Sequence, residues 1–153
     1  MPDVPDEMKT RGRPAMPFDD PSEYLYRRVS PTLWDEAGIE VDAVDLPDMS
    51  TNRARFGPPE WALLVDEDCR SWAVVGFMVR DIPPELVHLG VERYAFSPMH
   101  APTKNNYPHS EVRCFRNGVH INAKKDLDRE LHLRWREKLL WKVRTFIRPA
   151  ESA

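Results

Sequence analysis

The feature that most constrains this chain is the dipeptide Asn117-Gly118, which stands between two alternating segments. Both residue types accept the positive φ angles of a two-residue type I′ turn, so the dipeptide predicts a tight antiparallel β-hairpin. The turn also sets the register, because each residue before it then faces one residue after it. The expected pairs are Arg116 with Val119, Phe115 with His120, Cys114 with Ile121, Arg113 with Asn122, Val112 with Ala123 and Glu111 with Lys124.

This register gives the hairpin two different faces, since successive side chains of a strand point to opposite sides. The face that we expect in the core carries Val112, Cys114, Ile121 and Ala123. The opposite face carries His109, Glu111, Arg113, Phe115, His120, Asn122 and Lys124. We expect this second face to be solvated or to form a site.

A long helix is expected after the hairpin, up to residue 147. Asp126 is the expected N-cap, with Asp128 and Glu130 in the first turn, where the helix dipole favours negative charge. Apolar residues then recur at helical spacing and predict a core-facing stripe of Leu127, Leu131, Trp135, Leu139, Val143 and Phe146 or Ile147. Pro149 ends the pattern.

Composition is typical of one globular domain, with 153 residues, 41% of them hydrophobic and 31% charged. Fifteen prolines against six glycines predict extended rather than flexible connections. Arginine outnumbers lysine by sixteen to six, which we interpret as a hint of a bacterial, GC-rich genome. Without a long apolar run or a signal-like start, the chain is expected in the cytoplasm and away from membranes. Cys69 and Cys114 are expected as free thiols, the second buried.

The chain divides into a disordered or loosely draped proline-rich tail (1–19), a single domain (20–149) and a disordered C-terminus (150–153). We expect a short helix at 21–29, an edge strand at 39–46, a polar loop at 48–59, a hairpin of 61–65 with 71–79, a short helix or turn at 84–88 and a strand at 91–98. The predicted fold is α+β, with an antiparallel, meander-like sheet of four to six strands packed by one long C-terminal helix.

A first candidate site combines His109, Glu111 and His120 on the polar face of the hairpin. Two imidazoles and a carboxylate are a ligand set for zinc, iron or manganese, and they also provide acid–base groups. The two histidines lie some five residue pairs apart, however, at about 3.3 Å per residue. We therefore prefer a cross-strand charge ladder, with Glu111 facing Lys124, and predict no metal and no cofactor.

A second candidate is the basic second half of the predicted helix. Residues 124–148 hold nine basic and four acidic side chains, a net charge of +5 in a chain whose net charge is −3. The binding candidates are Arg134, Arg136, Lys138, Trp141, Lys142 and Arg144, with Arg53, Arg55 and Lys104 from the loops. Such a surface binds acidic proteins or phosphates, or it pairs with acids of its own domain.

A third candidate is a cleft formed where the polar loops 50–55 and 98–107 meet His109. His100 or His109 is the candidate general base there, but the pattern provides no recognised nucleophile. The chain has no glycine-rich phosphate loop and no serine elbow motif.

From these observations we expect a small interaction module that binds another macromolecule, a protein component of a multi-component bacterial system. Affinity for nucleic acid is expected to be weak, and the oligomeric state stays open. The alternative is a metal-dependent or acid–base hydrolase, nuclease-like in character, that uses His109, Glu111 and His120.

Overall fold

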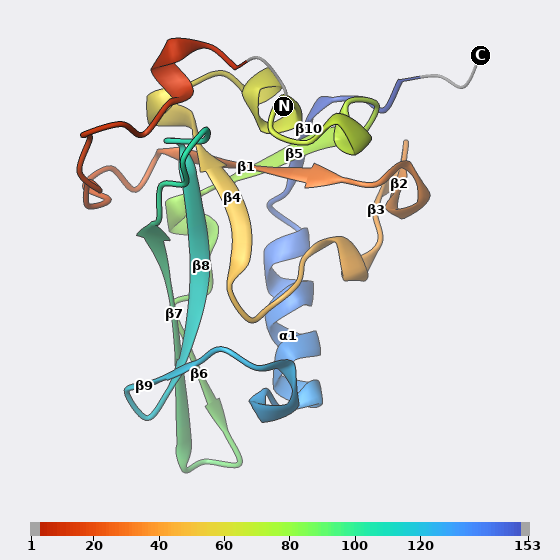
Figure 1. The fold of residues 1–153 in the computed structure, drawn as a ribbon. Coiled ribbons are helices and arrows are strands. Elements are labelled where there is room, and N and C mark those ends of the chain that lie inside the picture. Colours follow the sequence, from red (N-terminus) through yellow and green to blue (C-terminus); the bar gives the residue numbers. More distant parts are fainter. Residues whose placement is uncertain (1–3, 151–153) are drawn as a thin grey trace.

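Residues 4–150 of the chain, described by a computed structural model, build one large antiparallel sheet and one α-helix (Figure 1). The sheet consists of β1 (Tyr24–Val29), β4 (Met49–Arg53), β5 (Ala73–Met78), β6 (Glu85–His88), β7 (Glu92–His100), β8 (His109–Arg116), β9 (Val119–Ile121) and β10 (Arg144–Ile147). Their order is β10-β5-β1-β4-β8-β7-β6, with β9 beside β8. The α+β class is confirmed, but eight strands exceed the predicted four to six, and only β6 to β9 follow one another as a meander.

The β8–β9 hairpin is confirmed near its turn. Asn117 and Gly118 have φ angles of 49° and 84°, and three of the expected pairs form, including Cys114 with Ile121. Beyond Ile121 the strand ends, so the predicted pair of Glu111 with Lys124 is wrong. The first half of β8 pairs instead with β4, which comes from the segment predicted as a loop.

The helix α1 (Arg129–Leu140) is shorter at both ends than predicted. Asp128 is the N-cap, since its carboxylate accepts a hydrogen bond from the Leu131 amide at 2.9 Å, whereas Asp126 closes the 3-10 turn η8 (Lys124–Asp126). At the other end, the chain turns after Leu140 and becomes β10. The predicted helical positions of Phe146 and Ile147 are therefore wrong.

Phe146 gives a physical reason for strand β10. Its ring packs edge-on against Tyr24 and Tyr26, with centroids 5.2 and 5.1 Å away. Gly76 makes room for the ring, because a Cβ at that position would lie 2.8 Å from a Phe146 ring carbon. An edge strand on β5 thus gains aromatic contacts and ladder hydrogen bonds that another helical turn would not provide.

The middle of the helical stripe is confirmed as the centre of the core. Leu131, Trp135 and Leu139 are fully buried against one face of the sheet, which contributes Leu25, Phe77, Phe96, Val112 and Cys114 among others. Trp135 stacks on Phe96 with ring centroids 5.2 Å apart, and its indole N–H donates to the Pro83 carbonyl at 3.3 Å. Burial of this kind is the main source of folding free energy.

Several other assignments need correction. The segment 21–29 forms strand β1 rather than a helix, and 84–88 forms strand β6. Residues 61–63 of the predicted strand 61–65 belong to the 3-10 helix η5 (Pro59–Leu63), and β5 pairs with β1 and β10 instead. The predicted edge strand at 39–46 does not form as one strand. A two-residue strand, β3 (Gly38–Ile39), pairs with β2 (Trp34–Asp35), and the 3-10 turn η3 (Val41–Ala43) follows. The strands predicted at 71–79 and 91–98 are confirmed as β5 and β7.

The N-terminal segment 4–19 is draped over one end of the sheet (Figure 1). The predicted disorder is not shown in this described part of the chain. Met8 is buried and its carbonyl accepts the Tyr107 amide at 2.6 Å. The Tyr107 hydroxyl donates to the Pro14 carbonyl at 2.7 Å. Residues 1–3 and 151–153, where disorder was also predicted, lie outside the described residues. Within the described part, no helix is both long and apolar enough to cross a membrane.

Candidate functional site

The hairpin residues His109, Glu111 and His120 do not converge on one point. The His120 Nε2 lies 2.8 Å from the Asp48 carboxylate, and the Arg113 guanidinium donates to Glu111 at 3.5 Å. His109 contacts Ser50 and the Ala101 carbonyl. Throughout residues 4–150, no three His, Cys, Asp or Glu side chains are placed so that they could hold a metal ion.

The basic segment is partly paired with acids of its own domain. Arg136 donates to Asp42 at 3.3 Å and to Asp45 at 2.6 Å, and Lys124 donates to Asp45 at 3.2 Å. Burial alone would raise the pKa of Asp45, but the hydrogen bonds and positive charges of Arg136 and Lys124 hold it below its usual value. Arg148 pairs with Glu36 at 2.8 Å. These cations are therefore already neutralised.

A second group of cations lies close in sequence to an exposed tryptophan at the end of α1. The exposed side chains are Lys138, Trp141, Lys142 and Arg144, which we call the Trp141 surface. Trp141 is 88% exposed, and the three cations form no ion pair with any described residue. Arg134, on the preceding turn, is half-buried.

Trp141 stands at the rim of a groove between the end of α1 and the turn that joins β2 to β3. The groove has a volume of about 380 Å³, and its apolar lining is Ile39, Leu140 and Val143. Glu137 and Thr145 supply polar atoms. An aromatic side chain beside such a groove is the usual form of an anchor in protein recognition.

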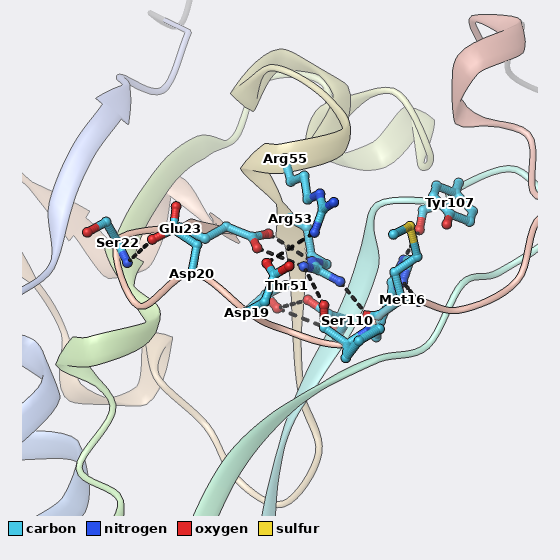
Figure 2. Close-up of polar contacts among 12 residues, drawn as sticks. Met16, Asp19, Asp20, Ser22, Glu23, Thr51, Arg53, Arg55, Tyr107 and Ser110 are labelled. Atoms are coloured by element: carbon cyan, nitrogen blue, oxygen red, sulfur yellow. Dashed lines mark hydrogen bonds and ion pairs between the residues drawn. The ribbon is translucent and has the colours of Figure 1, made fainter.

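Arg53 lies inside the protein, at the end of the sheet that the N-terminal segment covers (Figure 2). Its guanidinium makes a bidentate contact with Glu23, at 2.8 Å from Nε and 2.7 Å from Nη2. It also donates to the carbonyls of Met16 at 2.6 Å and Pro17 at 3.3 Å, and the Phe18 ring lies 3.7 Å below it. Arg53 therefore fastens the N-terminal segment to β4, and we leave it out of any ligand surface.

The other loop candidates differ in exposure. Arg55 donates to Asp19 at 3.2 Å on the surface, and Lys104 is exposed. His100 is enclosed, since its Nδ1 accepts the Met16 amide at 2.9 Å and its Nε2 donates to the Tyr107 carbonyl at 2.7 Å. Burial is the main reason why the pKa of His100 lies below its usual value. Both ring nitrogens of His100 are thus already in use.

The predicted meeting of the two polar loops does occur, on the face of the sheet that is turned away from α1. The side chains of Asn52 and Asn106 form a reciprocal amide pair, with distances of 3.1 and 2.7 Å. In the β4–β8 pairing, Asn52 lies opposite His109, and Ser50, two residues earlier on the same face, lies opposite Glu111. The resulting cleft, of about 220 Å³, is lined among others by Tyr26, Arg28, Ser50, Asn52, Thr103, Asn106 and His109.

Ser50 is the residue of this cleft that the sequence patterns did not single out as a functional group. Its hydroxyl lies 3.2 Å from the Nε2 of His109. No short-range signal identifies it, because β4 shows no alternation of apolar and polar residues after Met49. The polar residues of this strand predict a loop instead.

Comparisons of the chain with known protein families, with curated proteins and with solved structures find no match.

Proposed function

We propose that this protein is an interaction module, which binds an acidic segment of a partner protein on the Trp141 surface. The observation that carries the proposal is the 88% exposure of Trp141. Tryptophan is enriched among the residues that dominate binding energy at protein interfaces.

The chemistry of the surface defines the kind of partner. Lys138 and Lys142 place positive charge near Trp141 without any acid of the described chain to pair with them. Charge complementarity therefore favours aspartate and glutamate side chains at the rim. The apolar lining by Ile39 and Leu140 favours one apolar side chain beneath Trp141. A short acidic segment with an aromatic or aliphatic residue satisfies both requirements.

The same features argue against nucleic acid as the main ligand. The cations of Arg136 and Arg148 are paired with Asp42, Asp45 and Glu36, so the basic strip is interrupted. The chain as a whole has a net charge of −3. Each of these terms reduces the electrostatic attraction on which phosphate binding depends.

The proposed setting is a multi-component system in the cytoplasm of a bacterium. Cys69 and Cys114 are both free and buried, as expected for a chain that works in a reducing compartment. The excess of arginine over lysine motivates the bacterial assignment.

The experiment measures binding of fluorescent peptides that combine aspartate, glutamate and one central leucine or phenylalanine. We expect micromolar dissociation constants and a loss of about tenfold or more in Trp141→Ala, equivalent to about 1.4 kcal/mol. The double variant Lys138→Glu/Lys142→Glu should weaken binding further. Leu89→Ala and Lys125→Glu are the matched controls, because Leu89 is 83% exposed and Lys125 is exposed, both away from the groove.

A DNA duplex titrated at two salt concentrations tests the competing ligand. Tight binding of the duplex with a steep salt dependence, flattened by Lys138→Glu, would contradict the proposal. Equal peptide binding by the unmodified protein and Trp141→Ala would contradict it as well.

The alternative function, a hydrolase that uses His109, Glu111 and His120 together, lacks a supporting contact among the three. His109 by itself has a more specific partner in Ser50.

A further inference from the structure

The cleft on the sheet face remote from α1 contains a hydroxyl and an imidazole in hydrogen-bond contact. Ser50 of β4 and His109 of β8 lie on the same face of paired strands, with 3.2 Å between Oγ and Nε2. Ser50 is exposed, whereas His109 is half-buried. An accessible hydroxyl beside a fixed imidazole is the arrangement that activates serine as a nucleophile.

The tautomer of His109 follows from its other contact. Its Nδ1 lies 2.7 Å from the carbonyl oxygen of Ala101, which only accepts hydrogen bonds. Nδ1 therefore carries the proton in the neutral ring, and Nε2 presents its lone pair to Ser50. The Ala101 amide in turn donates to the His109 carbonyl at 3.0 Å, so the backbone holds the ring in place from both directions. This is the tautomer that a general base requires.

Arg28 adds a second observation on the same cleft. It lines the cleft from β1, and its Nη1 is buried without a hydrogen-bond partner in the described chain. A buried donor left unpaired costs free energy, which a bound anionic group would recover. The cleft volume of about 220 Å³ suits a small acyl group rather than a drug-sized ligand.

We propose that Ser50 is the nucleophile and His109 the general base of an esterase site for small acyl esters that carry an anionic group, with Arg28 as its contact. Ser50 Oγ attacks the ester carbonyl carbon while His109 Nε2 takes the hydroxyl proton. The bond from carbonyl carbon to alkoxy oxygen then breaks, and His109 returns the proton to the leaving alcohol. The product of this half-reaction is an acyl-Ser50 ester.

Water completes the cycle. His109 Nε2 takes a proton from a water molecule whose oxygen attacks the acyl carbon, and the proton then returns to Ser50 Oγ as the carboxylic acid leaves. The amide pair of Asn52 and Asn106 uses one hydrogen of each NH₂ group, so each side chain retains a second N–H. These hydrogens are the donors that the cleft offers to a developing oxyanion. The site is separate from the Trp141 surface and does not depend on the proposed function.

The first test uses a fluorophosphonate probe, from which an activated serine displaces fluoride to form a stable phosphonate ester. Mass spectrometry of the unmodified full chain should find the label on Ser50, a result that requires no variant. Ser50→Ala should abolish labelling, and His109→Gln should slow it about 100-fold or more, because the general base is removed. Ser71→Ala is the matched control, since Ser71 is exposed and does not line the cleft.

The outcomes separate activation from a structural hydrogen bond. No label on the folded protein, a label on Ser71 equal to that on Ser50, or an unchanged rate in His109→Gln would each overturn the proposal. Thermal unfolding of every variant shows whether a lost signal reflects lost folding, and the labelling rate of the unmodified chain stands independently of it.

The second test addresses the anionic group. Hydrolysis of a 4-nitrophenyl hemisuccinate, which carries a carboxylate, is compared with that of the neutral 4-nitrophenyl butyrate. The unmodified protein should prefer the anionic ester about tenfold or more, as expected for one charged hydrogen bond. Arg28→Gln should remove the preference, because it slows hydrolysis of the anionic ester about tenfold or more. Equal rates on both esters in the unmodified protein would overturn the role of Arg28.

Discussion

The two faces of the sheet differ in what their side chains do, and strand β8 shows the difference within one element. Its residues Ser110, Val112 and Cys114 are fully buried towards α1, whereas His109 and Glu111 are half-buried on the opposite face. One strand thus contributes packing on one side and polar groups on the other. The comparison teaches that stability and chemistry can be changed separately in this protein.

Polar groups also occur on the packed face, but there they are paired. The hydroxyls of Thr51 and Ser110 lie 2.6 Å apart, and Arg53 is held by Glu23. A buried polar group without a partner would cost about 1–3 kcal/mol, so the pairing preserves the free energy gained by packing. The position of a residue on a face, rather than its polarity, should decide how much its loss costs.

The largest effect is expected at Trp135. Replacing Trp135 by alanine removes a fully buried ring that stacks on Phe96, and it should lower the free energy of unfolding by about 3–5 kcal/mol. Urea unfolding followed by circular dichroism measures this. Leu133→Ala is the control on the same helix, because Leu133 is 46% exposed, and it should change stability by less than about 1 kcal/mol. A Trp135 variant with unchanged stability would mean that the two faces are not distinct.

The second prediction tests whether a charged residue on the packed face behaves as part of the core. Glu23→Gln leaves the Arg53 guanidinium buried without its carboxylate, so stability should fall by about 3 kcal/mol or more. The exposed pair of Glu36 with Arg148 provides the control. Glu36→Gln should alter stability by no more than about 0.5 kcal/mol. Equal effects in the two variants would show that Arg53 and Glu23 contribute only as a surface pair does.

The third prediction concerns pH and His132 of α1. The imidazole Nε2 accepts the Leu46 amide at 3.0 Å, and burial, followed by the nearby Arg136, lowers the pKa of His132 to about 4. In the unfolded chain it binds a proton near pH 6.5. Between these values the unfolded state binds more protons, so the contribution is fully present above about pH 6.5 and is lost as the pH falls towards 4.

Unfolding experiments from pH 7 to pH 4 measure this loss, which should amount to about 3 kcal/mol from the shift in pKa alone. His132→Gln is the comparison variant, because its amide oxygen accepts the Leu46 N–H and does not titrate in this range. A pH dependence as steep in His132→Gln as in the unmodified protein would assign the loss to other groups. Asp45, 3.8 Å from His132, is the nearest carboxylate to consider.

The smallest effects are expected on the cleft face. His109→Ala and His120→Ala should each change the free energy of unfolding by no more than about 1 kcal/mol, since neither side chain is packed in the core. Added zinc or manganese should not shift the melting temperature. Metal-dependent stabilisation that disappears in both variants would instead show that the two histidines share an ion.

The sequence by itself determined the features that depend on short-range geometry. Asn117 and Gly118 define a turn whose φ angles fix the hairpin register, and Cys114 is then buried by the period of two. The period of 3.6 likewise predicted the burial of Trp135. In each case the deciding residues lie within a few positions of one another.

The tertiary structure alone decided the strands β1, β4 and β10, and with them the cleft. β4 is polar after Met49, and β1 and β10 mix apolar and charged residues without regular alternation, so no local pattern distinguishes them from a helix or a loop. They become strands because partners distant in the sequence supply ladder hydrogen bonds, as β5 does for β1 and β10. Ser50 and His109, 59 residues apart, meet only through such pairing. The free energy of non-local pairing does not depend on any short segment alone. No short segment could therefore predict the candidate site.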